Sequence, residues 1–259
     1  MHLRWLGVVI VACLGLLPAL AGAQPPSDDQ IKAYLQKHPE VILEVLSQHK
    51  VELYNLVMAG REVRQRLIWR ENIRRGLANP LAPRVDPKRV VVGDAQAKVL
   101  VVEYTDFLCP SCRQAASNLE RLMAKHPKRF KLLVKHLPGS DLARQVALYY
   151  EAIGRQSPAK AWRFYQEVFH NQDLIAERGL AEVQALVKRL KIDPARLTRD
   201  LADKALAKRL EDDQAESKAF KLAGTPAFVT GGVVMRGPAP LAAFEDVWAI
   251  SQGEKLEPL

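Results

Sequence analysis

Two cysteines follow directly on an apolar segment, and this order constrains the fold more than any other feature of the chain. Val99-Leu100-Val101-Val102 is rich in β-branched residues, which indicates a buried strand. Cys109-Pro110-Ser111-Cys112 comes next with C-x-x-C spacing, and a helical pattern continues to about Lys125. The pair therefore lies at a strand-to-helix turn. Unpaired N–H groups and partial positive charge at a helix start stabilise a thiolate, the species that attacks disulfides.

The first 23 residues have the pattern of a cleavable signal peptide. Arg4 supplies positive charge, an apolar run to Leu17 is too short to span a bilayer comfortably, and Ala21-Gly22-Ala23 suits a signal peptidase. We expect residues 1–23 to be removed and the protein to be periplasmic. An uncleaved membrane anchor and a lipoprotein modified at Cys13 are the alternatives.

Cleavage would remove Cys13 and leave Cys109 and Cys112 as the only cysteines. A disulfide across two intervening residues constrains little of the unfolded chain, so redox chemistry explains the pair better than stability does. A zinc half-site is the alternative, but the nearest imidazoles, His126 and His136, lack the spacing of zinc ligands. We therefore expect no metal site, and no cofactor other than a redox-active disulfide between Cys109 and Cys112.

The charge of the chain argues against a nucleic-acid partner. The formal net charge is +9 at pH 7, and loss of Arg4 with the signal peptide leaves +8. The surplus basic residues are interleaved with acidic ones, and no aromatic residues alternate with them as in a nucleic-acid-binding surface. This pattern favours a solvated cationic surface.

Residues 24–78 are expected to form an N-terminal helical oligomerisation segment. Ser27 to Gln30 reads as a capping box, and Pro39 suits the first turn of a second helix that continues to about Arg75. An imperfect heptad pattern runs through it, formed by Ile42, Leu46, His49, Leu53, Leu56, Gly60, Val63 and Leu67. The helix either packs on its own domain or joins copies of the chain. We favour assembly, because the following domain is complete without it.

The remaining order of elements predicts an α/β fold. Three prolines in residues 79–87 indicate a linker, and residues 88–259 form the next domain. Its strands and helices alternate as strand, helix, strand, then a helical block at about 139–222, and finally a hairpin and a helix. A βαβ unit followed by a ββα unit is the thioredoxin fold, here with an inserted helical domain. The expected elements are strands 89–92, 98–104, 130–137, 227–230 and 233–235, and helices 112–125, 141–222 (interrupted) and 240–250.

Four features in sequence order resemble the DsbA-like branch of thioredoxin-fold thiol:disulfide oxidoreductases. They are Glu103 six positions before the first cysteine, the Cys109 to Cys112 motif, the helical insertion, and Gly224-Thr225-Pro226-Ala227-Phe228. The resemblance covers roughly residues 90–250. A shorter match at residues 31–42 resembles the suppressor-of-copper-sensitivity C proteins, which are oligomeric DsbA-like proteins tied to copper stress.

The resemblance implies a role for each site residue. Cys109 is the nucleophile, and Cys112 is the resolving thiol that releases the product. Glu103 is a buried acid that exchanges the proton of Cys112, unless it lies on the surface. Pro226 follows a cis peptide bond opposite the dithiol, unless it is an ordinary trans turn proline. Together with Thr225 it binds a substrate peptide through backbone groups.

The residues between the cysteines tune the couple. Pro110 fixes φ and removes an N–H group, whereas Ser111 lacks the charge of the histidine that the strongly oxidising relatives carry there. Thr225 before the proline also resembles the isomerase-type members.

These features predict a periplasmic thiol:disulfide oxidoreductase that leans towards isomerase activity. Its partners would be cysteine-containing secreted proteins and a membrane or periplasmic redox partner that resets the dithiol. The alternative is a copper-binding or copper-stress protein that holds Cu(I) between the two thiolates.

Overall fold

The computed structural model describes residues 25–254, so the signal peptide expected at 1–23 lies outside the described residues. The chain divides into two compact units, residues 1–61 and 62–259. Among the helices of residues 25–254, none combines the length and apolar character needed to cross a membrane.

The first unit is helical. Helix α1 (Asp28–Lys37) starts at the predicted capping box, and α2 (Pro39–Gln48) starts with its proline in the first turn. Helix α3 (Lys50–Ala78) follows. The expectation of one helix from Glu40 to Arg75 is wrong, because the backbone at His49 leaves helical values with φ −108° and ψ 29°. Neither proline nor glycine marks this position in the sequence.

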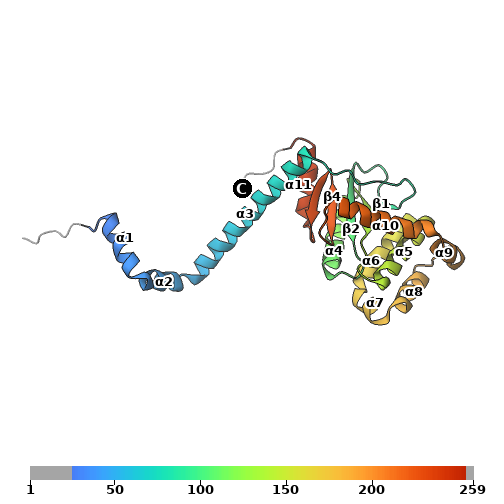
Figure 1. The fold of residues 1–259 in the computed structure, drawn as a ribbon, viewed down its shortest axis with the longest axis horizontal. Coiled ribbons are helices and arrows are strands. Elements are labelled where there is room, and N and C mark those ends of the chain that lie inside the picture. The colour runs from blue at the N-terminus through green and yellow to red at the C-terminus, as the bar shows by residue number, and fades with distance from the viewer. Residues whose placement is uncertain (1–24, 255–259) are drawn as a thin grey trace, which may run out of the picture. The chain divides into compact units, whose positions relative to one another are not determined.

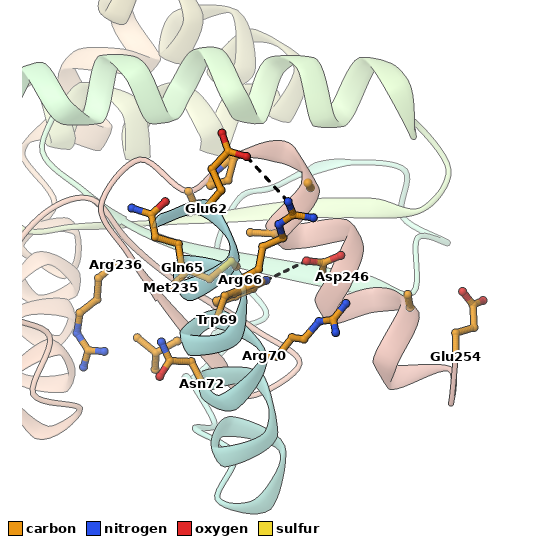
Figure 2. A pocket seen from close by; sticks show the side chains of 16 residues that line it. Glu62, Gln65, Arg66, Trp69, Arg70, Asn72, Met235, Arg236, Asp246 and Glu254 are labelled. Carbon is orange, nitrogen blue, oxygen red and sulfur yellow. Dashed lines mark hydrogen bonds and ion pairs between the residues drawn. The ribbon is translucent and has the colours of Figure 1, made fainter. Parts of the chain in front are cut away.

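The second half of α3 packs on the second unit (Figure 2). Ile73 is fully buried in a cluster with Val233, and the Trp69 Nε1 donates a hydrogen bond to Asp246 at 3.0 Å. A Cβ atom at Gly76 would lie 2.9 Å from the Cα of Val233, so only glycine permits this close approach. Residues 62–78 are thus part of the second unit.

The proline-rich segment 79–87 is also attached to the second unit. The Leu81 N–H donates to the Gly232 carbonyl at 3.1 Å, and the Arg84 N–H donates to Glu216 at 2.7 Å. The boundary expected at residues 79–87 therefore falls earlier, between Arg61 and Glu62. The reason is that the apolar residues of α3 beyond Arg61 have a surface of their own domain to pack against.

A five-stranded sheet forms the centre of the second unit. Its order is β1-β3-β2-β4-β5, with β2 and β3 parallel and the other pairs antiparallel. The strands are β1 (Val91–Gly93), β2 (Val99–Thr105), β3 (Phe130–His136), β4 (Ala227–Thr230) and β5 (Val233–Arg236). Helix α4 (Pro110–Lys125) joins β2 to β3, and α11 (Leu241–Ser251) follows the hairpin. This arrangement confirms the thioredoxin fold.

Six helices are inserted between β3 and β4, as expected, and Figure 1 shows α5 to α9 gathered beside the sheet. They are α5 (Asp141–Gln156), α6 (Pro158–His170), α7 (Gln172–Arg178), α8 (Leu180–Arg189), α9 (Pro194–Leu201) and α10 (Lys204–Ala219). Ser157 and Asp193 cap α6 and α9 directly before their prolines. Tyr150, Phe164, Tyr165 and Phe169 are buried in the shared core.

A buried cluster of charges joins the inserted helices to the rest of the unit. The Arg89 guanidinium, 5% exposed, donates to Glu151 on α5 at 2.9 Å and to Asp213 on α10 at 2.5 Å. Lys135 on β3 forms an ion pair with Glu216 on α10. Burial disfavours the charge on Glu151, but Arg89, His136 and Arg209 together outweigh it and lower the pKa of this carboxyl to about 2. Arg89 therefore joins two buried acidic side chains from different inserted helices.

Replacing Arg89 should unfold this unit more readily. In Arg89→Leu the carboxylates of Glu151 and Asp213 lose their main partner, and we expect a loss of about 3–5 kcal/mol in the free energy of unfolding. Urea denaturation at pH 7 measures it. Lys208→Leu breaks the exposed pair with Asp212 on α10 and should cost less than about 1 kcal/mol. Equal losses in both variants would contradict the role of Arg89.

Candidate active site

Cys109 occupies the N-cap of α4, with extended backbone at φ −79° and ψ 124°. Its carbonyl accepts the N–H groups of Cys112 at 3.0 Å and Arg113 at 3.2 Å, which closes the first turn. Pro110 stands at the first helical position, where a missing N–H is harmless, and Ser111 beside it is exposed. The side chain of Cys109 is half-buried. The nucleophile predicted from the sequence thus lies at the helix start.

The surroundings of Cys109 favour its thiolate. Burial opposes the charged form, but hydrogen bonds from the N–H groups of Cys112 and Ser111, and from the side chains of Thr225 and Cys112, outweigh it. The net result is a pKa of the Cys109 thiol below its usual range. This thiol is the more acidic of the pair.

Cys112 has the opposite character. It is fully buried one turn further along α4, and burial raises the pKa of its thiol to about 12. Both cysteines are in the free thiol form in this structure. One partly exposed thiol of lowered pKa therefore stands in front of one buried thiol of raised pKa.

The loop before β4 faces Cys109. The Thr225–Pro226 peptide bond is cis, as the sequence predicted. The Cys109 thiol donates to the Thr225 carbonyl oxygen, with 3.8 Å between sulfur and oxygen. Pairing of Ala227 with Tyr104 on β2 fixes this loop next to the active-site turn. The loop thus presents a backbone carbonyl beside the reactive sulfur.

Glu103 is fully buried on β2, which excludes the surface alternative. The Tyr165 hydroxyl on α6 donates to its Oε2 at 2.9 Å, while Oε1 has no hydrogen-bond partner among the described residues. Burial raises the pKa of this carboxyl to about 7 in spite of the hydrogen bond. Its charge in turn raises the pKa of Cys112. The two groups are therefore electrostatically coupled, and the carboxyl can exchange protons near neutral pH.

Asp106 holds the turn before Cys109 in place. It is half-buried and accepts two backbone N–H groups, from Leu108 at 2.7 Å and from Gly139 at 2.8 Å. The carboxylate thus holds the turn before Cys109 against the loop that follows β3. Aspartate is suited to this because its short side chain readily bonds nearby backbone N–H groups.

Sequence reasoning missed two contributors from the inserted helices. Tyr165 is a buried core residue whose hydroxyl also reaches Glu103. Gln172 donates to the carbonyl oxygens of Phe107 and Cys109. Neither residue belongs to a motif, and only the packing of the insertion on the βαβ unit brings them to the site.

The described residues give no support to a zinc site. His126 contacts Glu245 at 2.5 Å and His136 contacts Glu151 at 3.0 Å, so both imidazoles have other partners. Within residues 25–254, no group of three or more His, Cys, Asp or Glu side chains is arranged to hold a metal ion.

A groove of about 930 Å³ lies elsewhere on the second unit, between α3 and α11 (Figure 2). Its lining residues include Arg66, Trp69, Arg236 and Asp246. None comes from the Cys109–Cys112 motif (the redox turn) or from the cis-proline loop. This groove is therefore separate from the partly exposed dithiol.

The thioredoxin family profile matches residues 85–247, which is more than half of the chain. The chain belongs to the thioredoxin family. The matched range contains the dithiol, Glu103 and the cis-proline, so the family assignment and the site geometry concern the same residues.

Curated relatives of this thioredoxin-family chain fall into two groups. Na(+)/H(+) antiporter NhaA 3 of Salinispora tropica is 31% identical over 172 residues, covering 65% of this chain and 25% of the antiporter. The probable disulfide bond formation protein D of Bacillus cereus is 28% identical over 152 residues, 54% of this chain and 69% of that protein. The chain spans about a quarter of the length of the antiporters it matches. These matches support the shared family more than either named activity.

Solved structures share the fold. The thiol-disulfide exchange protein α-DsbA2 from Wolbachia pipientis has a TM-score of 0.57 at 16% identity, covering 64% of this chain and 88% of its own. The catalytic domain of Proteus mirabilis ScsC has a TM-score of 0.56 at 18% identity, covering 69% and 94%. The expected DsbA-like architecture of this thioredoxin-family protein is thereby confirmed.

Burial of Glu103 should make stability depend on pH. Its pKa is about 7 in the folded protein and close to the ordinary glutamate value of 4.5 in the unfolded chain. The stability present below pH 4.5 is therefore lost as the pH rises through 7, by about 3 kcal/mol. Glu103→Gln cannot ionise and should gain that amount relative to the wild type between pH 4 and pH 8. Urea unfolding of the reduced proteins measures it. Glu177→Gln, exposed on α7, should follow the wild type, and the same behaviour from Glu103→Gln would refute the argument.

Proposed function

We propose that this chain is a thiol:disulfide oxidoreductase that exchanges disulfides with other proteins through a mixed disulfide at Cys109. One observation carries the proposal. The acidic thiol of Cys109 lies at the start of α4, 3.8 Å from the carbonyl of the residue before a cis-proline, with the buried thiol of Cys112 directly behind it.

Reduction or reshuffling of a substrate starts from the dithiol. The Cys109 thiolate attacks one sulfur of a substrate disulfide, forming an S–S bond to that sulfur while the substrate bond breaks and its electron pair leaves with the other sulfur. A free substrate thiolate can then attack the mixed disulfide, which rearranges the substrate and returns Cys109 unchanged. Alternatively, Cys112 attacks Cys109, releases the substrate thiol and leaves the Cys109–Cys112 disulfide. Oxidation of a substrate is the same path in reverse.

Glu103 suits the proton transfer that the resolving step requires. Cys112 must lose its proton to attack, and its thiol resists this because it is buried. The Glu103 carboxylate is suitably placed to act as the base, since it is buried on the adjacent strand and its charge affects the pKa of Cys112. Its pKa of about 7 allows it to accept the proton and return it near neutral pH.

The substrate peptide would bind at the cis-proline loop. Backbone groups of Thr225 lie beside Cys109, and an extended peptide pairing with this loop would place its own disulfide against the sulfur. The neutral Ser111 is exposed in the first turn of α4 and adds no positive charge to the thiolate. Together with Thr225, this supports a couple that is less oxidising than that of a dedicated oxidase, and hence an isomerase-leaning role.

The finer aspects of the proposal are location, partners and assembly. The pattern of residues 1–23 and the similarity to a protein titled periplasmic thioredoxin-like, from Salmonella enterica, support a periplasmic protein acting on secreted proteins. A membrane or periplasmic redox partner would reset the dithiol.

No residue of α1 or α2 is buried, and apolar side chains of the heptad pattern are exposed, up to 71% at Leu56. This supports a homo-oligomer, because exposed apolar stripes usually mark an interface.

Substitution of each cysteine should separate the two steps. Cys109→Ser removes the attacking sulfur and should abolish exchange, whereas Cys112→Ser cannot resolve and should accumulate mixed disulfides at Cys109. The assay is refolding of a secreted protein with scrambled disulfides, with mass spectrometry of adducts before and after reduction. Ser111→Ala keeps both thiols and should remain active.

Absence of any adduct in Cys112→Ser would contradict the proposed mechanism. Titration of the reduced wild type with Cu(I) in the same series tests the copper alternative. Tight Cu(I) binding by a protein without exchange activity would favour it over the oxidoreductase.

Charge in the heptad pattern should break the assembly. Leu53→Glu and Leu56→Glu place carboxylates in the exposed apolar stripe of α3, and we expect the mass measured by light scattering to fall to that of one chain. Asn55→Glu, exposed on the same turn but outside the pattern, should leave the mass unchanged. Removal of residues 24–61 should also give a single, redox-active chain. A wild type that is already monomeric would refute the oligomer.

A further inference from the structure

Gln172, the first residue of α7, reaches the active-site turn from the inserted helical domain. Its side chain is buried, with only 3% of the residue exposed. The Nε2 group donates two hydrogen bonds, to the carbonyl oxygen of Phe107 at 2.9 Å and to that of Cys109 at 3.0 Å. One amide group thus holds the backbone at the nucleophile and two residues before it.

The next residue of α7 binds the other side of the motif. Asp173 accepts both terminal N–H groups of Arg113, each at 2.8 Å, and Arg113 directly follows Cys112. Because this ion pair is exposed, it contributes little on its own. The buried amide of Gln172 is therefore the stronger of the two links between α7 and the turn.

The contacts of Gln172 adjoin the N–H groups that favour the Cys109 thiolate. The Cys109 carbonyl, which accepts from Gln172, also accepts the N–H groups of Cys112 and Arg113 in the first turn of α4. Phe107 is itself almost completely buried, so its carbonyl lies in a poorly hydrated region. Loss of a donor there leaves a buried acceptor short of a partner, and the backbone shifts to find another.

We propose that Gln172 is a positioning residue for Cys109. The side-chain amide of Gln172 fixes the backbone of residues 107–109, so that the Cys109 sulfur stays beside the start of α4 and the Thr225 carbonyl. The inference rests on the proposed function, since it concerns how the inserted domain supports the same exchange reaction. A glutamine is suited to this position because its NH₂ group offers two donors from a single nitrogen. Neither an acid nor an apolar residue of the same length supplies them.

Variants of Gln172 test the inference against a matched control. Gln172→Met keeps the length of the side chain without donors, Gln172→Glu presents acceptors instead, and Gln172→Asn keeps both donors on a shorter stem. Gln156 is the control, because its amide also bridges two elements of the inserted domain, with contacts of 3.2 and 3.1 Å to the backbone of Asp193. Both of these hydrogen bonds stay within the inserted domain.

The readouts are the ultraviolet titration of the Cys109 thiolate and the rate of its alkylation at pH 6. We expect alkylation to fall roughly tenfold in Gln172→Met, because small misplacements of a reacting group have effects of this order or larger. Its titration midpoint should move upward. Gln172→Glu should lose more, since it adds negative charge near the sulfur. Gln172→Asn should recover part of the loss, and Gln156→Met should match the wild type.

Two results separate this inference from the function on which it rests. An acidic Cys109 in the wild type with unchanged titration and alkylation in Gln172→Met would overturn the role of Gln172 alone. A wild-type Cys109 that ionises like free cysteine would overturn the proposed function and this inference together. If Gln172→Met does not fold, as judged by circular dichroism, the comparison of Gln172→Asn with Gln156→Met decides the matter by the same two measurements.

Discussion

The first turn of α4 is the interaction on which the site depends. A helix start offers N–H groups that have no partner within the helix, and a sulfur placed at the N-cap can accept them. Cys109 is at that position, and its neighbours in the motif provide the donors. Three residues later the helix has carried Cys112 into the core, where the Asp106 N–H donates to its sulfur at 3.5 Å but burial outweighs this contact. A single turn of helix therefore makes two chemically identical thiols unequal.

Two buried glutamates, Glu103 and Glu151, differ in the pKa of their carboxyl groups. Glu103 on β2 is close to its protonation midpoint at neutral pH, because only one of its oxygens accepts a hydrogen bond and no cation compensates for burial. Glu151 is buried to the same extent but faces Arg89, which keeps it ionised. The difference in partner, and not the depth of burial, separates a carboxyl that can transfer a proton from one that holds the structure together.

Much of this could be predicted from the sequence where local pattern decides the outcome. The dithiol, the cis-proline and the strand boundaries follow from short motifs, and the caps at Ser157 and Asp193 follow from residues beside prolines. The break at His49 could not be predicted, since no residue there disfavours helix. The start of the second unit at Glu62 could not be predicted either. It depends on whether the apolar face of α3 packs on Val233 of the same chain or on another chain. Gln172 and Tyr165 act across more than sixty positions of sequence, a separation over which one chain carries no contact information.

The described fold is held together without a disulfide bond. Within residues 25–254 the only cysteines are those of the active site, and both are free here. The inserted helices are fastened instead by an arginine between two acids and by aromatic packing. The described fold therefore does not depend on a disulfide bond, and a change in the redox conditions around it leaves these contacts in place.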